Sequence, residues 1–559
     1  MSLSAPPPDE RPGRFRATWS VERMLLACAL FWVLAANRPL LAFVVRDQPP
    51  DAPSTWFALA CWVVALTALH ALLLAPLANR YTARPLLAVM IIVTALSAYY
   101  MQHLSVYLDP TMLRNVMRTD VREAGELVGP GLLLPMLLTA VLPLVLLWRV
   151  RPAVRPWRRA LLVRIGFMLA MAGLLVGAVL AQFQPLASMM RNHKEARYLI
   201  TPANVLWSVT SVATAATQER ARPRQPIGED AVLVDKATRP QLVVFVVGET
   251  ARAANWGLNG RLNGYARDTT PELGKLPTLL NYTDVTSCGT NTEVSLPCIF
   301  APVGRRDHDE RRIRGQQSLL HVLSRAGVGV LWRDNQSGCK GVCEGLAMQM
   351  AADFAPPGLC SEGRCYDEAL LAGLPEMLRG LHGTQFLVLH PIGNHGPAYF
   401  RRYPPAHRHY LPACEQDDLR RCTREEVVNA YDNALRYTDR WLAQLVRTLD
   451  AASDRVDTAM VFVSDHGESL GENNLWLHGL PYAIAPDVQK KVPMVAWTSE
   501  GFARRKGLDV ACLRGRTGQP VSHDHLFHTL LTMNGVRTSL HEPAWDLTTG
   551  CRQAESVQP

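Results

Sequence analysis

Hydrophobic residues are distributed unevenly along the chain. Five apolar stretches lie in its N-terminal part, each close to the roughly 20 residues that a helix needs to cross a bilayer. They cover residues 22–44, 55–77, 85–103, 131–149 and 160–181. Beyond them, charged residues of both signs are spread along the chain, as in water-soluble domains. The pattern therefore predicts a five-helix membrane part followed by a soluble part.

Arginine in the short loops predicts the orientation of the five helices. Arginines precede the first apolar stretch, occur at Arg80 and Arg84, and form a run from Arg149 to Arg164. Because such residues stay in the cytoplasm, the N-terminus is expected inside and the fifth helix is expected to lead into the periplasm of a bacterial inner membrane. This bias also accounts for the formal net charge of +9. No basic stripe interleaved with aromatic residues accompanies it, which excludes a nucleic-acid partner.

These patterns divide the chain into four parts. No cleavage site follows the first apolar stretch, so the leader is expected to be retained. The expected parts are a cytoplasmic leader (residues 1–20), a transmembrane domain (21–183) with a periplasmic amphipathic segment near 104–130, a periplasmic bridging helix and linker (184–240), and a periplasmic α/β domain (241–559).

The segment between the third and fourth apolar stretches carries a polar repeat. Asn115, Thr119 and Glu123 recur at i, i+4 and i+8, which on one helix places them on one face. A solvated interfacial helix and a surface that holds a lipid headgroup are both consistent with this spacing.

Cysteine placement supports the periplasmic assignment. Ten of the twelve cysteines follow residue 280, and most are close pairs that suit an oxidising compartment. Ten cysteines allow many connectivities, and local pairing is the simplest. The expected pairs are Cys288/Cys298, Cys339/Cys343, Cys360/Cys365, Cys414/Cys422 and Cys512/Cys551. A zinc ribbon is the competing interpretation for Cys339, Cys343, Cys360 and Cys365.

Three apolar runs in the soluble part end in polar clusters. Residues 241–247, 385–389 and 458–463 lack apolar/polar alternation, which predicts strands buried on both faces of a parallel sheet. Open α/β sheets form ligand sites at the carboxyl ends of their strands, so the residues that follow these runs are expected to converge. They are Glu249, His395, Asp465 and His466, with His478 farther along. Oxygen and nitrogen ligands without thiolate favour catalytic zinc, with manganese as second choice.

The candidate nucleophile lies in a turn rich in glycine and hydroxyl groups. Thr292 ends the string SCGTNT, and a divalent metal would activate its hydroxyl. Without metal ligands elsewhere, the same string would be an ordinary loop with helix-capping hydroxyls. Lys340, between Cys339 and Cys343, is a cation suited to a phosphate oxygen.

Several strings together resemble one enzyme family. They are VVGETARAANWGLNG, TSCGTNTEVSLPCIF, WRDNQSGCKGVC, HPIGNHGPAYFRRYP, SDHGESLGENNLWLHGLPYAIAP and RNHKEARYLI. They resemble the phosphoethanolamine transferases of Gram-negative envelopes, which include lipid A modifiers and mobile colistin resistance enzymes within the alkaline phosphatase and sulfatase superfamily. One departure is Gln336, where family members often carry a second asparagine.

The resemblance implies roles for individual residues. A first zinc would be held by Glu249, Thr292, Asp465 and His466, with Thr292 carrying a covalent phosphoethanolamine. His395 and His478 would bind a second zinc or the phosphate of the intermediate, with Lys340 beside them and Glu468 supporting the metal. The implied donor-headgroup surface comprises Asn115, Thr119, Glu123, Ser337 and Lys340.

The function implied by the resemblance is transfer of phosphoethanolamine from phosphatidylethanolamine to lipid A by a monomeric, membrane-embedded enzyme. The added ethanolamine cation would lower the negative charge of the envelope and confer polymyxin resistance. A core sugar (Kdo or heptose) or another envelope glycan as acceptor, a sulfatase-like phosphodiester hydrolase and a phosphoglycerol transferase remain alternatives. A non-enzymatic sensor should have lost a metal ligand or the nucleophile, and none is missing.

Overall fold

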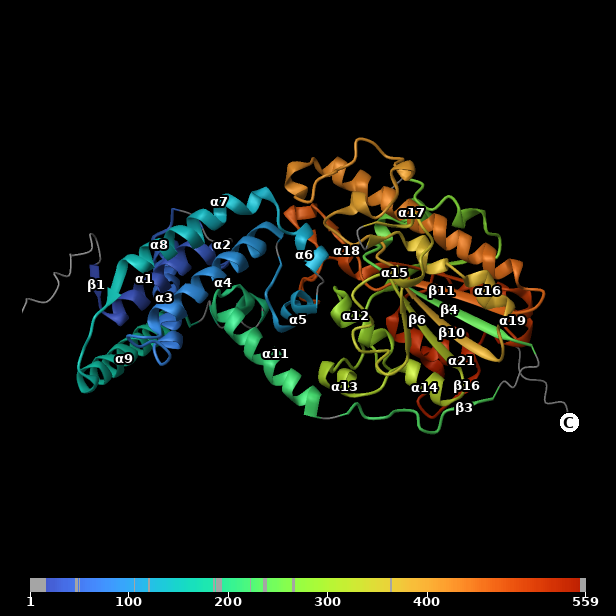
Figure 1. Ribbon diagram of the computed structural model, residues 1–559, viewed down its shortest axis with the longest axis horizontal. Helices are drawn as coiled ribbons and strands as arrows, with labels where there is room; N and C mark the ends of the chain where they lie inside the picture. The colour runs from blue at the N-terminus through green and yellow to red at the C-terminus, as the bar shows by residue number, and fades with distance from the viewer. Residues whose placement is uncertain are drawn as a thin grey trace, which may run out of the picture. The chain divides into compact units, whose positions relative to one another are not determined.

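The protein consists of two compact units. The computed structural model describes residues 17–45, 49, 51–104, 106–118, 121–183, 186, 194–221, 223–234, 239–263, 267–361 and 364–552. One unit, here the helical unit, comprises Met1–Pro110 and Pro130–Ser211, and the other, the sheet unit, comprises Thr111–Gly129 and Val212–Pro559. Figure 1 shows mostly helices in the first, with the short strand β1 (Ala17–Trp19), and a central sheet in the second.

The helical unit contains the predicted membrane helices. Among the residues that the structure describes, four helical stretches are long and apolar enough to cross a membrane: α3 (Pro53–Leu74), α4 (Ala83–Leu104), the stretch Pro130–Arg149 and α9 (Trp157–Ala181). A fifth span exists if α1 (Val21–Ala36) and α2 (Arg38–Val45), which are bent by 63°, count as one. The bend coincides with Pro39, whose ring and missing N–H are incompatible with a continuous helix.

An eight-stranded sheet forms the centre of the sheet unit. Its strand order is β15-β5-β14-β11-β4-β10-β6-β7. The strands are β4 (Gln241–Gly248), β5 (Leu280–Thr286), β6 (Gly329–Asp334), β7 (Ala347–Met350), β10 (Thr384–His390), β11 (Asp457–Ser464), β14 (Lys491–Thr498) and β15 (Val521–Ser522). Within this sheet β14 runs against its neighbours β5 and β11. Every residue of β4 and β11 is buried, which confirms the predicted central strands.

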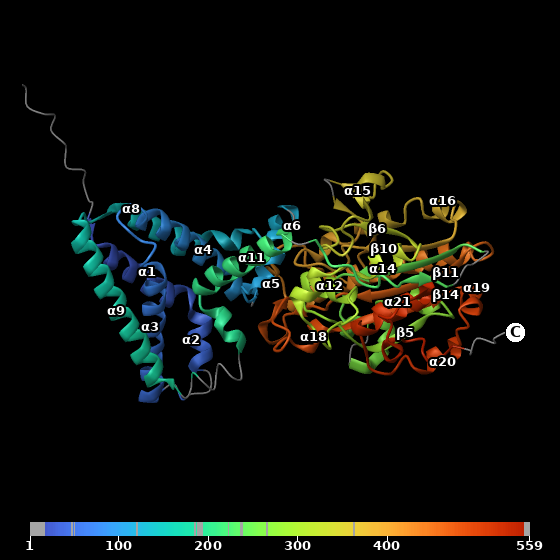
Figure 2. The same cartoon turned by 90° about the horizontal axis from the view of Figure 1, so that it is seen from below.

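Helices cover both faces of the sheet. Phe245 and its neighbours on one face pack against α12 (Thr292–Ile299), α14 (Leu319–Arg325) and α21 (Leu526–Asn534). On the other face, α17 (Arg424–Ala451) presents a stripe of buried side chains that includes Trp441. Figure 2 shows α21 and α14 in front of the strands, whereas α17 lies above them in Figure 1. The result is an α/β sandwich in which helices cover the two faces of the sheet, whereas the loops at the ends of the strands can form a site.

Two short helices from the loop between α4 and Pro130 belong to the sheet unit. They are α5 (Pro110–Arg118) and α6 (Val121–Glu126), and Figures 1 and 2 both show α5 beside α12. We expected this segment within the transmembrane domain, but residues 111–129 group with the sheet because their charged side chains pair there. The other expected domain boundaries stay predictions.

Five disulfides hold the loops of the sheet unit. The bonded pairs are Cys288–Cys298, Cys339–Cys343, Cys360–Cys365, Cys414–Cys422 and Cys512–Cys551, as local pairing predicts. The zinc-ribbon interpretation is wrong, because all four of its sulfur atoms are in disulfides. Cys28 and Cys61 are free, as expected for cysteines that fill apolar helices.

Candidate active site and metal centre

Neighbouring parallel strands bring the polar clusters together. In the sheet, β4 lies between β11 and β10, and all three run in the same direction. Glu249 follows β4, whereas Asp465 and His466 follow β11. The Asp465 amide donates to the Gly248 carbonyl over 2.8 Å, and the Asn394 amide donates to the Glu249 carbonyl over 3.1 Å. The predicted convergence at the carboxyl ends is therefore confirmed for these residues.

A close approach of two loops makes this packing possible. Gly393 has a φ of +52°, and a Cβ there would lie 2.7 Å from the Glu249 carbonyl oxygen. A side chain at this position would therefore push the segment after β10 away from Glu249.

Glu249, Asp465 and His466 form a candidate metal site. One ligand atom from each lies within 4.8 Å of the others, and all three residues are buried. His466 Nε2 is 3.3 Å from Glu249 Oε1 and 3.4 Å from Asp465 Oδ2. Two carboxylates and one imidazole are a ligand set that suits zinc.

The electrostatics of this cluster favour a cation between the three side chains. Burial and the charge of Glu249 raise the pKa of Asp465 to about 6. Burial would lower the pKa of His466, but Asp465 and Glu249 outweigh it and raise that pKa to about 10. Burial also opposes ionisation of Glu249, yet its hydrogen bond with His466 and that residue's charge hold the Glu249 pKa well below its usual range. The two carboxylates thus stabilise a positive charge at His466 Nε2. A divalent cation bound there would provide that charge in place of the proton on the imidazole.

Thr292 begins the helix that points at this cluster. Its Oγ1 donates to Glu249 Oε2 over 3.1 Å and lies 3.3 Å from His466 Nε2. Asn291 caps α12 by accepting from the Val294 amide, so Thr292 is at the positive end of the helix dipole. A Cβ at Gly289 would lie 2.9 Å from Ser295 Oγ, so glycine lets the turn fold against α12. The hydroxyl can therefore act on a group bound beside the two carboxylates.

His395 and His478 lie at one side of the cluster. Their ring centroids are 5.7 Å apart, and the His478 ring is 4.2 Å from that of His466. Glu468 orients His478 through a contact of 2.8 Å to Nδ1, and the Tyr399 hydroxyl donates to the other oxygen of Glu468 over 2.9 Å. Burial and the charge of His466 lower the pKa of His478, which keeps its imidazole neutral and able to bind a metal or a proton.

The loop after β6 carries Gln336, Ser337 and Lys340. Gln336 Nε2 donates to Glu249 Oε2 over 2.9 Å and to the Pro391 carbonyl over 2.6 Å. Lys340 Nζ donates to Ser337 Oγ over 2.7 Å. The side-chain amide of Gln336 thus reaches a candidate metal ligand directly.

The expected headgroup residues are only partly described. Asn115 lies on α5, Thr119 lies outside the described residues, and only the backbone of Glu123 is described, on α6. Because α5 ends at Arg118 and α6 begins at Val121, the three residues do not share one described helix. Their common face stays a prediction.

Two further residues, Glu293 and His523, support the Thr292 turn, although the sequence assigned them no role. Glu293 is fully buried beside Thr292 and pairs with Arg314 at 2.8 Å and Arg118 at 2.7 Å. His523 accepts from the Cys288 amide over 3.0 Å and contacts the Ser464 carbonyl at 3.0 Å, joining the Thr292 turn to β11. Arg118 is 175 residues from Glu293, and Cys288 is 235 residues from His523. At such separations the spacing of residues in the sequence does not predict the contact.

Comparison with known proteins agrees with the fold and the site. Residues 241–536 match the Sulfatase family, so the sheet unit is of the sulfatase class. Residues 66–217 match the family described as phosphoethanolamine transferase EptA/EptB. The chain belongs to the phosphoethanolamine transferase family and is an integral membrane enzyme of that family.

Relatives of nearly full length support this assignment. The phosphoethanolamine transferase EptA of Escherichia coli K12 is 39% identical over 84% of this chain and 86% of its own. The phosphatidylethanolamine transferase Mcr-1 of Escherichia coli is 35% identical over 92% of this chain and 96% of its own. The integral membrane lipooligosaccharide phosphoethanolamine transferase A of Neisseria meningitidis superposes with a TM-score of 0.90 at 34% identity, covering 96% of this chain and all of that one.

Proposed function

We propose that this protein transfers phosphoethanolamine from phosphatidylethanolamine to lipid A at the periplasmic face of the bacterial inner membrane. The observation that carries the proposal is the contact of the Thr292 hydroxyl with Glu249 and His466, at 3.1 and 3.3 Å. It is supported by the names of the relatives, which include a Kdo(2)-lipid A phosphoethanolamine 7''-transferase of Escherichia coli at 27% identity. The enzyme acts as a monomer.

The residues at the site fit one zinc ion. Asp465 Oδ2 is buried and has no hydrogen-bond partner within the described parts of the chain, as expected for an oxygen reserved for a metal. Glu249, Asp465, His466 and Thr292 would hold this ion, and His395 with His478 would hold a second one or the phosphate. Bound zinc would lower the pKa of the hydroxyl and neutralise charge on phosphoryl oxygens.

In the first half-reaction, the Thr292 oxygen attacks the phosphorus of phosphatidylethanolamine. The bond from phosphorus to the diacylglycerol oxygen breaks, diacylglycerol leaves with a proton, and phosphoethanolamine remains on Thr292. The N-terminus of α12 faces the negative charge of the phosphoryl group. Lys340 and Ser337 contact the headgroup, together with Asn115, Thr119 and Glu123.

In the second half-reaction, a phosphate oxygen of lipid A attacks the same phosphorus and releases Thr292. His395 or His478 takes up or returns the proton, and Glu468 keeps His478 oriented for this task. The product gains an ethanolamine cation, which weakens the attraction between the envelope and cationic peptides such as polymyxins.

Mass spectrometry of the purified protein tests the covalent step. After incubation with phosphatidylethanolamine, a phosphoethanolamine adduct is expected on the peptide that contains Thr292 and is expected to be absent in Thr292→Ala. Diacylglycerol release without a trappable adduct would instead favour the hydrolase. Transfer from the adduct to lipid A, compared with Kdo- or heptose-containing core oligosaccharide, identifies the acceptor.

A further inference from the structure

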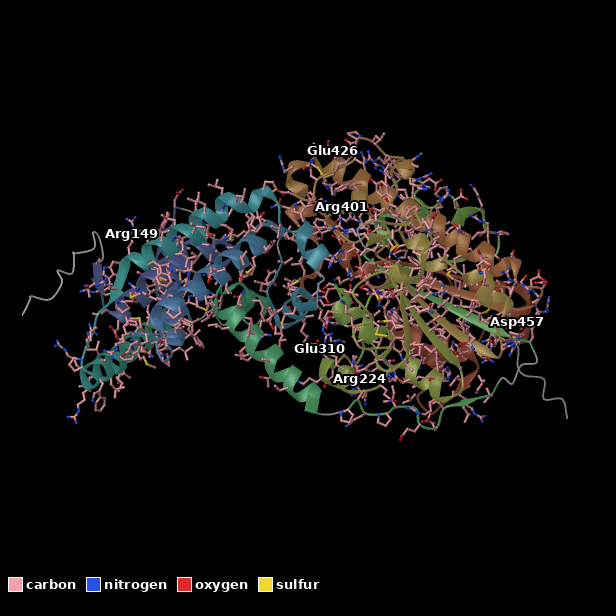
Figure 3. All side chains as sticks on the ribbon, in the orientation of Figure 1. Arg149, Arg224, Glu310, Arg401, Glu426 and Asp457 are labelled. Carbon is pink, nitrogen blue, oxygen red and sulfur yellow. A yellow bond between two sulfur atoms is a disulfide. The ribbon has the colours of Figure 1, made fainter. Side chains whose placement is uncertain are left out.

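A single carboxylate from the loop between α4 and Pro130 is surrounded by arginines. Glu126, the last residue of α6, has a side chain that is only 2% exposed. Its oxygens lie 2.6 Å from Arg402, 3.4 Å from Arg364 and 3.7 Å from Arg401. Arg401, labelled in Figure 3, also pairs with Asp417 at 3.0 Å, and so depends less on Glu126 than Arg402 does.

Arg402 connects Glu126 to the site. Its Nη2 donates to Glu126 Oε2 over 2.6 Å, while its Nε donates to the carbonyl oxygen of His395 over 2.6 Å. The side chain of Arg402 is 6% exposed, so both bonds lie in an environment with little water. Charge-assisted hydrogen bonds of this kind are short and directional, and they fix the backbone that they reach. Through Arg402, the carboxylate of Glu126 thereby holds the backbone of His395 in position.

The same loop touches two other elements of the site. Met112 on α5 packs against Gly479, next to His478, so closely that a Cβ at Gly479 would collide with its terminal methyl. Arg118 pairs with Glu293, the residue after Thr292. Glu310, labelled in Figure 3, accepts hydrogen bonds from Arg114 and Arg314. The loop therefore contacts the surroundings of three separate site residues.

We propose that Glu126 is a positioning residue for the transfer reaction, acting through Arg402 on the backbone of His395. This rests on the function proposed above. The enzyme needs His395 at a fixed distance from the phosphoryl group, and displacement of a reacting group by about 1 Å can cost two orders of magnitude in rate. A helix that only anchors the loop would not require its carboxylate to meet an arginine that also holds the backbone of a site residue.

The test measures diacylglycerol formation by the full-length protein in detergent micelles, with fluorescent phosphatidylethanolamine as donor and lipid A as acceptor. Glu126→Gln keeps the size of the side chain and removes its charge. We expect kcat to fall about tenfold, in the range typical of residues that orient ligands, while KM changes less than about twofold. Glu126→Asp should recover part of the loss, because it restores the charge.

The mechanism through Arg402 has its own test. In an Arg402→Gln background, Glu126→Gln should lower kcat by less than about twofold, because the connection is already broken. Additive losses would overturn the proposal, and so would an unchanged kcat per folded molecule or a loss confined to KM. Should Glu126→Gln fail to fold, Arg402→Lys decides instead. Lysine keeps the charge beside Glu126 but lacks the planar guanidinium that makes both bonds, so an unchanged kcat would contradict the proposal.

The matched control is Glu415→Gln. Glu415 pairs with Arg408 at 2.7 Å in the same unit, but its side chain is 48% exposed. This variant should retain the kcat of the wild type. Absence of diacylglycerol formation by the wild type would refute the proposed function itself. Normal rates in the wild type, in Glu415→Gln and in Glu126→Gln would refute only the role of Glu126.

Discussion

Thr292 Oγ1 lies 3.1 Å from Glu249 Oε2, although the two residues are 43 positions apart. The contact places a hydroxyl at the start of a helix against a carboxylate at the end of a central strand. Three features accompany this contact. Thr292 lies at the N-terminus of a helix dipole, the cluster beside it is buried and contains both acidic and imidazole side chains, and Gly289 leaves the preceding turn without a side chain. This contact is the basis of the predictions that follow.

Replacement of the hydroxyl should abolish the first half-reaction. Thr292→Ala leaves no oxygen to attack phosphorus, and we expect diacylglycerol formation to fall by at least about a thousandfold. Thr292→Ser keeps the oxygen and loses only a methyl group, so it should retain measurable adduct and turnover. Initial rates and intact mass of both variants check this, and an adduct on Thr292→Ala would assign the nucleophile elsewhere.

The amide of Gln336 should tune the metal site. Gln336→Asn shortens the side chain by one methylene, so its amide no longer reaches Glu249 while it still lies in the loop. We expect an affinity for zinc lower by about tenfold, with a parallel loss of turnover at limiting metal. Competition with a zinc-binding dye measures the affinity. Gln317→Asn, which changes a half-buried hydrogen-bond partner of Arg325 away from the metal site, is the matched control and should leave the affinity unchanged.

Removal of metal should reversibly stop the reaction and lower stability. A chelator would leave the paired carboxylates of Glu249 and Asp465 without their cation, and a ligand present at a hundred times its Kd stabilises a folded protein by about 2.7 kcal/mol. Tm should therefore fall and recover when zinc is added back. His466→Ala should show neither the fall nor the recovery. A Tm of the wild type that is indifferent to chelation would argue against metal at this site.

Stability of the sheet unit should decrease in mild acid because of His523. Burial lowers the pKa of its imidazole from 6.5 to about 3, so the folded protein resists a proton that the unfolded chain accepts. The stabilisation is complete above pH 6.5 and is lost as the pH falls toward 3, by about 2 kcal/mol at pH 5. His523→Gln can keep both hydrogen bonds without titrating. Thermal unfolding at pH 7 and 5 should thus show a smaller acid shift in this variant than in the wild type, and equal shifts would contradict the assignment.

Much of the architecture follows from local pattern. Apolar runs near the length of a bilayer identify the membrane helices, and continuous apolar runs of seven or fewer residues identify β4, β10 and β11, because burial on both faces removes alternation. The position of Glu249 and Asp465 after two of these strands predicts their convergence, since parallel strands end at one edge. The nearness of cysteines in sequence likewise predicts four of the disulfides, and Cys512–Cys551 joins the two cysteines that remain.

Only the tertiary structure decided what lies around the site. The sequence by itself determined a membrane part, a parallel sheet and a set of metal-binding side chains, because these depend on the periodicity and chemistry of short segments. It could not reveal that Arg402 joins Glu126 to His395, or that His523 ties the Thr292 turn to β11. Those contacts join residues up to 276 positions apart. The sequence around a charged or aromatic side chain does not indicate which distant residue it will contact. Their geometry is fixed by the packing of the sheet and its helices.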